Sequence, residues 1–310
     1  MALDIVALGE PLYELNRQRD GHFLRGFGGD TSNVAIAAAR LGARAAYVTR
    51  IGRDMYGDAL LELWDREGVD ASAVARDEEA PTGLYFVTHE GGGHQFTYRR
   101  KGSAASRMTA GDVPEQLIAR ARYLHVSGIS QAISGTAAAA VDHAIAIAIM
   151  AGAAVSYDTN YRPKLWSAEL ARLAVERTAA HAAILKTSLE DAGELLQLRD
   201  PPAIARHCIG LGSKAVVVTL GGDGVLVATA AGSAIIPGYR VSTTDATGAG
   251  DAFTGALLAE LARGETLFTA CRFANAAAAL STLGYGAIAP LPRRAEVLQF
   301  LSARGEAKSL

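Results

Sequence analysis

The residues best suited to chemistry are Gly248, Ala249, Gly250 and Asp251, which come directly before an expected helix over 252–262. Small residues let the backbone approach a ligand closely, and the amide groups at a helix start point outward with the helix dipole behind them. Such a turn can hold an anion while Asp251 accepts a proton, so the pairing suits phosphoryl transfer to a hydroxyl group. The alternative is an ordinary glycine-rich turn with an aspartate at a helix start.

Composition excludes several classes of protein. The 310 residues carry 30 Lys and Arg against 32 Asp and Glu, and half of them are hydrophobic, which is typical of a globular protein with no general attraction to nucleic acid or anionic lipid. The longest apolar stretch, 144–155, is too short for a bilayer, which needs about 20 residues. Cys208 and Cys271 form neither a disulfide framework nor a ligand cluster, and Met1 is followed by no signal-peptide pattern. We therefore expect a cytoplasmic protein without nucleic-acid or membrane partners.

The elements that must position this turn follow a β-α-β pattern, in which short β-branched runs alternate with longer Ala- and Leu-rich stretches. The expected strands are 5–8, 45–49, 123–126, 154–157, 183–186 and 215–219. The expected helices are 32–41, 57–67, 136–151, 168–180, 189–196, 203–211, 252–262 and 267–282. Residues 13–27 and 83–100 alternate with period two around glycine-rich turns, which predicts antiparallel hairpins. We expect a single α/β domain over 1–310, with a mostly parallel sheet and a small β-strand lid from segments near 11–27 and 83–106.

Several motifs along the chain occur in the order seen in ribokinase-like sugar kinases, whereas a Walker-type phosphate loop is absent. These motifs are Gly9-Glu10, Gly28–Asn33 with Ala35, Leu41-Gly42, Gly52–Asp54 with Gly57, and Gly248–Asp251. The chain resembles this family over essentially its full length. The resemblance implies a three-layer ribokinase-like core, a lid over the sugar, magnesium-ATP as phosphoryl donor and Asp251 as the base. A monovalent cation is a further candidate cofactor whose requirement the sequence leaves open.

Within the family, four stretches are most similar to kinases of 2-keto-3-deoxygluconate. They are 28–31, 96–100, 127–130 and 158–166. The resemblance therefore implies a sugar acid as the substrate.

Two arginines independently favour an acidic substrate. Arg100 ends an expected lid strand, and Arg162 follows an expected strand at the carboxyl edge of the sheet, where open α/β sheets bind ligands. Two guanidinium groups converging from opposite sides would hold a carboxylate, and a neutral sugar would leave their charge unpaired. The alternatives are a solvated strand residue for Arg100 and a loop residue stacked on an aromatic ring for Arg162.

Further residues on the sugar side come from the first long helix and the lid. By resemblance, Gly29, Asp30 and Asn33 bind sugar hydroxyls, although Asp30 and Asn33 are also ordinary cap residues. Tyr85 and Tyr98 are expected on paired lid strands, where they could cover and hydrogen-bond the substrate; cross-strand aromatic packing is the alternative.

The nucleotide side is expected around a glycine-rich loop after the strand 215–219. By resemblance, the ATP-binding residues are Ser188, Thr219, Gly221, Gly222, Gly224, Gly248, Gly250 and Asn275. The loop could equally be a β-turn, since Gly-Asp-Gly is common in turns. Asp191 stands where the family has a glutamate of the magnesium and phosphate network; it would reach a metal only through water, and a helix first-turn aspartate is the alternative.

We hypothesise ATP-dependent phosphorylation of the terminal hydroxyl of 2-keto-3-deoxygluconate to the 6-phosphate. The alternatives are a kinase for a neutral sugar such as fructose or ribose, and a non-catalytic sugar sensor. A sensor would have no use for the base Asp251. Because the lid of such kinases can pair across subunits, we expect a homo-oligomer. The sequence leaves the choice between gluconate and galactonate forms open.

Overall fold

The computed structural model describes residues 3–90 and 93–306, and its largest sheet has eight strands in this part of the chain. The spatial order is β14-β13-β12-β11-β10-β9-β1-β4. The parallel strands are β1 (Leu3–Leu8), β4 (Ala45–Val48), β9 (Ala121–Ser127), β10 (Ala154–Asp158), β11 (Ile184–Ser188) and β12 (Ala215–Thr219). At one edge β13 (Gly224–Thr229) and β14 (Gly232–Pro237) add an antiparallel hairpin that the sequence analysis does not include. The predicted mostly parallel α/β sheet is confirmed.

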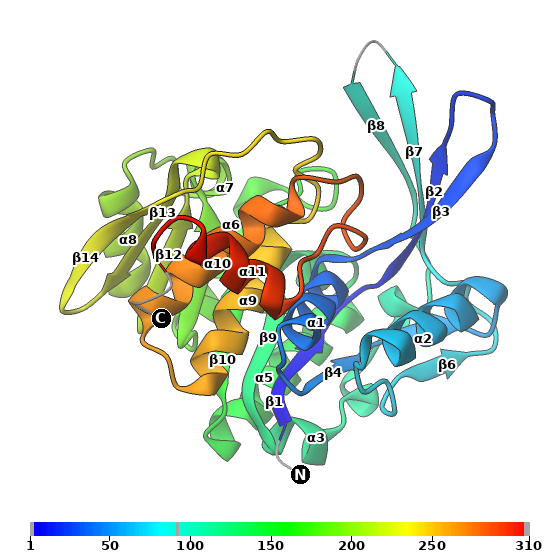
Figure 1. Cartoon of the computed structure of the whole chain (residues 1–310). Helices are drawn as coiled ribbons and strands as arrows, with labels where there is room; N and C mark the ends of the chain where they lie inside the picture. Colours follow the sequence, from blue (N-terminus) through cyan, green and yellow to red (C-terminus); the bar gives the residue numbers. More distant parts are fainter. Residues whose placement is uncertain (1–2, 91–92, 307–310) are drawn as a thin grey trace.

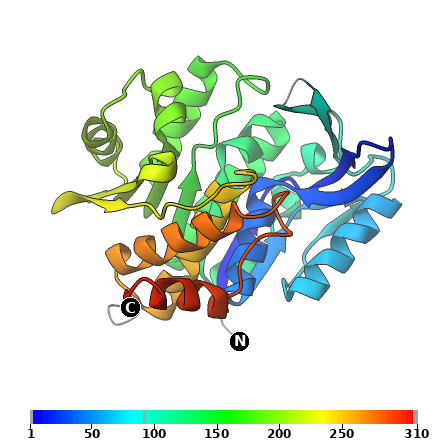
Figure 2. The ribbon, with the colours of Figure 1, turned by 45° about the horizontal axis from the view of Figure 1, so that its top comes forward.

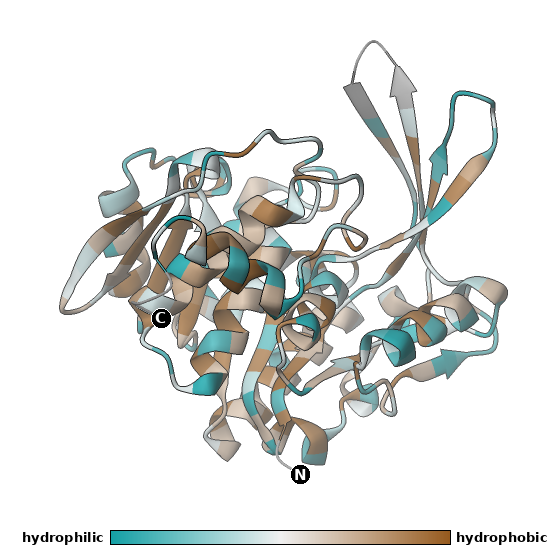
Figure 3. Cartoon of the chain, viewed as in Figure 1, coloured by the Kyte–Doolittle hydropathy of each residue, from teal (hydrophilic) through white to brown (hydrophobic). Residues whose placement is uncertain are grey.

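The sheet is buried on both faces because its strands are apolar in consecutive positions. In β1, Val6 and Leu8 pack into one hydrophobic cluster, whereas Ile5 and Ala7 belong to clusters on the other face. Figure 3 shows the same pattern, with hydrophobic strands inside and hydrophilic residues on the outward sides of the helices. The parallel strands therefore form the rigid interior from which their carboxyl-terminal loops project.

Helices cover both faces and give a three-layer core (Figures 1 and 2). The helices packed on one side are α1 (Asp30–Arg40), α2 (Met55–Glu67), α9 (Ala249–Arg263), α10 (Leu267–Ser281) and α11 (Arg294–Ser302). Those on the other side are α3 (Glu115–Ala119), α4 (Gly128–Ala132), α5 (Gly135–Ala151), α6 (Ala168–Ala179), α7 (Leu189–Leu195) and α8 (Pro201–Gly210). Among residues 3–90 and 93–306, none of these helices is long and apolar enough to cross a membrane.

The lid is a four-stranded sheet in the order β3-β2-β7-β8, and it projects from the core beside α1 and α2 (Figure 1). Its strands are β2 (Leu12–Arg17), β3 (Phe23–Gly28), β7 (Leu84–Glu90) and β8 (Gly93–Arg99). The two antiparallel hairpins of the prediction are present, and β2 joins them by pairing in parallel with β7. A third sheet is a short parallel pair of β5 (Arg50–Gly52) and β6 (Ala75–Asp77). The remaining elements are three 3-10 turns, η1 (Ala105–Arg107), η2 (Ala110–Asp112) and η3 (Gly221–Asp223).

Two helix starts differ from the prediction in a way that matters for the site. Helix α1 begins at Asp30 rather than at residue 32, and α9 begins at Ala249 rather than at residue 252. In both cases a glycine with positive φ, Gly29 or Gly248, occupies the N-cap position. Asp30 and Asp251 therefore lie within the first turns of two helices.

Candidate active site

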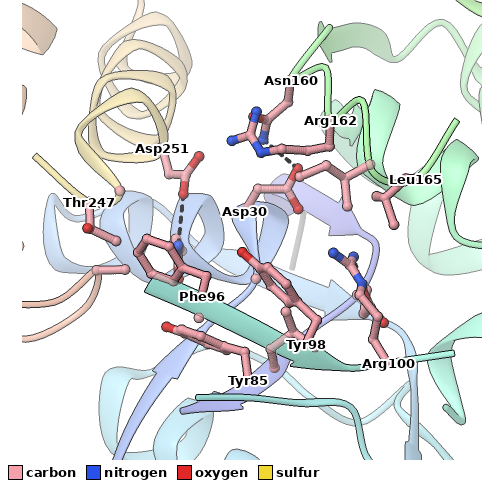
Figure 4. Close-up of a pocket in the computed structure, with 18 of the residues that line it drawn as sticks. Asp30, Tyr85, Phe96, Tyr98, Arg100, Asn160, Arg162, Leu165, Thr247 and Asp251 are labelled. Atoms are coloured by element: carbon pink, nitrogen blue, oxygen red, sulfur yellow. Dashed lines mark hydrogen bonds and ion pairs between the residues drawn. The ribbon is translucent and has the colours of Figure 1, made fainter. Parts of the chain in front are cut away.

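A cavity of about 960 Å³ lies under the lid, at the carboxyl edge of the parallel strands. Its walls come from the lid, the start of α1, the loop after β10 and the start of α9 (Figure 4). We call it the sugar-side cavity. A second cavity of about 430 Å³, the loop-side cavity, shares Ala246 and Gly250 with the first. The start of α9 therefore separates two adjoining spaces.

Asp251, the third residue of α9, faces the sugar-side cavity (Figure 4). Its Oδ2 accepts a hydrogen bond from Asn33 Nδ2 at 2.8 Å. Burial, followed by the nearby charge of Asp30, raises the pKa of Asp251 to about 7, while Asn33 and Lys186 act in the opposite direction. A carboxylate with a pKa near neutrality is suited to act as a general base at physiological pH.

The turn before Asp251 is held in place by its own side chains. Asp245 Oδ1 accepts hydrogen bonds from the amide of Thr247 at 2.9 Å and from its hydroxyl at 2.7 Å, and Asp245 Oδ2 accepts one from the amide of Gly286 at 2.9 Å. Gly248 has φ 76°, and a β-carbon there would lie 3.0 Å from that of Ala287, so the left-handed turn requires glycine. The first amides of α9 have no partner within the helix and can face an anion between the two cavities.

Lys186 is a buried cation beside this turn, and the sequence analysis does not include it. Its Nζ donates to Asp158 Oδ2 at 2.6 Å, and a β-carbon built on Gly250 would lie 3.3 Å from the same Nζ. Burial acts to lower the pKa of Lys186, but Asp158, Asp251 and Asp191 raise it above its ordinary value. Lys186 was the last residue of an expected strand, so its place at the binding edge of the sheet was a usable signal.

The start of α1 supplies polar groups on the floor of the sugar-side cavity. Gly29 has φ 104°, and a β-carbon there would lie 2.3 Å from the carbonyl oxygen of Glu10. Asp30 Oδ2 accepts a hydrogen bond from Asn160 Nδ2 at 2.8 Å (Figure 4). Asp30 Oδ1 and Asn33 Oδ1 are buried and have no hydrogen-bond partner among the described residues. Such acceptors would be satisfied by ligand hydroxyl groups, which agrees with the predicted placement of Asp30 and Asn33.

The lid contributes an aromatic wall. Tyr85 and Tyr98 are directly paired across β7 and β8, and their rings stack with centroids 5.7 Å apart. Both line the sugar-side cavity. The Tyr85 hydroxyl donates its proton to buried Glu14, which leaves only its oxygen to accept from a ligand, and its role in binding stays a prediction. Phe96, two residues before Tyr98 on β8, also lines the cavity, and its period-two spacing could have identified it.

The two arginines line the sugar-side cavity, from the end of β8 and from the loop after β10 (Figure 4). Arg162 Nη1 donates to the carbonyl oxygen of Tyr161 at 2.7 Å. A carbonyl oxygen has no formal charge, so this contact does not compensate the positive charge of Arg162. Arg100, in contrast, forms an ion pair with Glu10, whose side chain is fully buried. The argument that a neutral sugar would leave the charge of Arg100 unpaired is therefore wrong, because Glu10 already compensates it.

The loop-side cavity gathers most of the residues expected to bind the nucleotide. Thr219, Gly221, Gly222, Gly224, Gly250 and Asn275 line it. The amide of Asn275 also donates to the carbonyl oxygens of Ile236 and Pro237, each at 3.2 Å, so it fixes the end of β14.

The structure does not bring Ser188 or Asp191 to the wall of either cavity. Ser188 caps α7 by accepting a hydrogen bond from the Asp191 amide at 2.9 Å. Asp191 Oδ2 accepts from Thr159 Oγ1 and from the amide of Tyr161, each at 3.1 Å, and so holds the loop that carries Arg162. In the described part of the chain, no group of three or more His, Cys, Asp or Glu side chains is arranged as a metal site. The assignment of Asp191 to a metal stays a prediction.

Comparisons with known proteins agree with this geometry. The model of a family described as pfkB family carbohydrate kinase matches residues 2–294. The chain is 37% identical to the 2-dehydro-3-deoxygluconokinase of Thermoproteus tenax, over 96% of this chain and 94% of that protein. It is also 37% identical to fructokinase-1 of Zea mays, over 90% of this chain and 89% of that protein. The crystal structure of a fructokinase from Xylella fastidiosa with bound ATP superposes with a TM-score of 0.89 at 27% identity, covering 99% of this chain and 100% of that one.

Proposed function

Since this chain belongs to the pfkB family of carbohydrate kinases, we propose that it transfers the γ-phosphoryl group of ATP to the terminal hydroxyl of 2-keto-3-deoxygluconate, giving the 6-phosphate. This compound, also called 2-dehydro-3-deoxygluconate, is a six-carbon chain with a carboxylate at one end and a primary hydroxyl at the other. The proposal rests on the polarity of the sugar-side cavity. Asp251 and the cationic Arg162 face this cavity from different elements (Figure 4), and Lys101 and Lys164 also line it.

In this proposal Asp251 accepts the proton of the terminal hydroxyl as its oxygen attacks the γ-phosphorus. The new P–O bond forms while the bond from the γ-phosphorus to the bridging oxygen breaks, and ADP leaves with that electron pair. The amides at the start of α9 and the ammonium group of Lys186 stabilise the charge on the transferred group. Phe96 and Tyr98 cover the cavity from the lid, so water has poor access to the phosphoryl group.

In this proposal the nucleotide occupies the loop-side cavity, where the glycines of the β12–β13 turn would leave backbone open to phosphates and ribose. Magnesium bound with ATP would supply positive charge to the phosphates, and such an ion commonly needs only one or two protein carboxylates. The closest candidate by sequence is Asp191, acting through water.

The carboxylate of the substrate would be held mainly by Arg162. Its guanidinium group faces the sugar-side cavity, and its hydrogen bond goes to the uncharged carbonyl oxygen of Tyr161 rather than to a carboxylate. Arg100 contributes hydrogen bonds rather than uncompensated charge, because Glu10 is its partner.

A kinase for a neutral ketose is the second candidate, and one observation favours it. The Glu10–Arg100 pair is electrically neutral. The cavity therefore has less uncompensated positive charge than two unpaired arginines would give, which makes it more favourable for a sugar without a carboxylate. The equal identity to a fructokinase points the same way.

The decisive experiment measures ADP release with saturating magnesium-ATP and a range of concentrations of 2-keto-3-deoxygluconate, fructose or ribose in parallel. We expect kcat/KM for the sugar acid to exceed that for either neutral sugar by at least about tenfold, the ratio given by 1.4 kcal/mol. A preference for a neutral sugar would leave Asp251 and the kinase activity in place but refute the substrate. The absence of turnover with all three would refute the proposed reaction.

A further inference from the structure

Glu10 and Arg100 form an ion pair in the wall of the sugar-side cavity. The Glu10 side chain has no exposed surface and that of Arg100 is 13% exposed. Glu10 Oε1 also accepts a hydrogen bond from Ser103 Oγ at 3.2 Å. An arginine cannot give up its proton. Burial raises the pKa of Glu10, whereas the charge of Arg100 and the hydrogen bonds from Arg100 and Ser103 act in the opposite direction and favour the ionised pair. The pair therefore has no net charge although both members line the cavity.

The position of Glu10 explains why it can act on Arg100 from the core. It lies two residues after β1, the strand between β9 and β4 in the large sheet, and two residues before the lid strand β2. Arg100 directly follows β8, the outer strand of the lid. The pair thus joins the root of the lid to the core at the sugar-side cavity, and the Nε of Arg100 remains buried without a hydrogen-bond partner among the described residues.

We infer that Glu10 is a positioning and specificity-determining residue. It orients the guanidinium group of Arg100 toward the sugar and cancels its charge. The preference for a sugar acid over a neutral sugar is therefore smaller than it would be with two arginines of uncompensated charge. The inference deepens the proposed function, because it concerns the same cavity and the same carboxylate. It differs from a purely structural role, which would affect acidic and neutral sugars alike.

The test measures a selectivity ratio, kcat/KM for 2-keto-3-deoxygluconate divided by kcat/KM for fructose, at pH 8. The variant Glu10→Gln keeps an oxygen that can accept from Arg100 but removes the negative charge. Removing one unit charge at a partly buried site near the substrate carboxylate should raise the ratio by about tenfold, mainly through a lower KM for the acid. An unchanged or lower ratio would overturn the inference.

The double variant Glu10→Gln/Arg100→Gln supplies a second measurement, and it leaves no buried charge unpaired if a single variant folds poorly. It has the same net charge as the wild-type pair, so its ratio should stay within about threefold of wild type, less than 1 kcal/mol, even if both kcat/KM values fall. A drop of tenfold or more would show that Arg100 acts as an uncompensated clamp and would overturn the inference.

The matched control is Glu67→Gln. Glu67 pairs with Arg40 at comparable burial, 6% and 12% exposed, but neither residue lines the sugar-side or the loop-side cavity. This variant should lose stability without a change in the selectivity ratio. The proposed substrate is judged separately, by the wild-type ratio: a wild-type preference for fructose would refute the sugar acid, whereas the direction of change in the variants tests Glu10 in either case.

Discussion

Replacing Asp251 by Asn should remove most of the turnover and, at the same time, make the folded protein more stable above neutral pH. The reason is the environment of this carboxyl group, in which burial and the charge of Asp30 raise its pKa to about 7 from an ordinary value of 3.8. The folded state therefore binds the proton more tightly than the unfolded state does. Asparagine has almost the same shape, can still accept the hydrogen bond of Asn33, and carries no charge to be buried.

The size of the effect follows from this difference in pKa. At 1.36 kcal/mol for each pKa unit, ionised Asp251 lowers the free energy of unfolding by about 4 kcal/mol, and the substitution recovers this amount. The gain is absent below pH 3.8, where the carboxyl group is protonated in both states, it grows as the unfolded carboxyl ionises, and it is complete above about pH 7. With an unfolding entropy of about 2 cal/mol/K per residue, the gain corresponds to a Tm higher by about 6 °C.

The assay combines thermal unfolding of wild type and Asp251→Asn at pH 5 and pH 8 with steady-state turnover. We expect the full increase in Tm at pH 8, less than half of it at pH 5, and a kcat lower by about 10² to 10⁴, the usual contribution of a general base. The control is Asp65→Asn on the exposed side of α2, which removes one carboxylate outside both cavities and should leave kcat unchanged. An equal or lower Tm for Asp251→Asn at pH 8 would refute the argument from burial, and near wild-type turnover would refute the assignment of the base.

Three further predictions concern the base, the substrate carboxylate and one glycine. Because the proton acceptor must be ionised, kcat should rise about tenfold between pH 6 and pH 8, with a midpoint near the Asp251 pKa of about 7. Asp30→Asn should move this midpoint to lower pH, because it removes a like charge beside Asp251. A kcat that does not change with pH would contradict this prediction. Arg162→Ala should raise KM for 2-keto-3-deoxygluconate by about 10- to 100-fold, the value of one charged hydrogen-bonded contact, with little change in KM for fructose; equal changes for both sugars would show that Arg162 does not hold the carboxylate. Gly29→Ala should lower the free energy of unfolding in urea by at least about 2 kcal/mol, because its φ is 104° and the added carbon would lie 2.3 Å from the Glu10 carbonyl oxygen. The control is Gly42→Ala, where φ is 96° and the space around the residue is open. It has the backbone strain without the close contact, so it should lower the free energy of unfolding by less.

The parts of the structure that the sequence predicts best are those determined by local pattern. The six parallel strands and the long helices follow from hydrophobic runs and turns, whereas β5 and β6 have only three residues each and show no period. The hairpin β13–β14 follows a Gly-Asp-Gly turn, but β14 is mostly exposed, so its composition carries little strand signal. Helix starts at Asp30 and Ala249 depend on glycine caps in left-handed conformations, which sequence periodicity does not register.

The site is predictable only to the extent that motifs mark it. Asp251, Asp30 and the glycines lie in recognisable turns, and the structure brings them together. The contacts between them join distant parts of the chain: Asn33 bonds Asp251 across 218 positions and Arg100 meets Glu10 across 90. No local pattern specifies such partners, so the compensation of Arg100 could not be foreseen from its own surroundings in the sequence.

The separation between lid and core has a consequence for how such an enzyme can diverge. The aromatic wall that faces the sugar, Tyr85, Phe96 and Tyr98, lies on two lid strands, whereas Gly250, Asp251 and Lys186 belong to the core. If the proposed roles hold, mutations in β7 and β8 can change the acceptor while the residues proposed for phosphoryl transfer stay the same. Two relatives named for different sugars are each 37% identical to this chain, which is consistent with such a change of acceptor within the family. A laboratory selection for new acceptors should accordingly randomise the lid positions first and spare the start of α9.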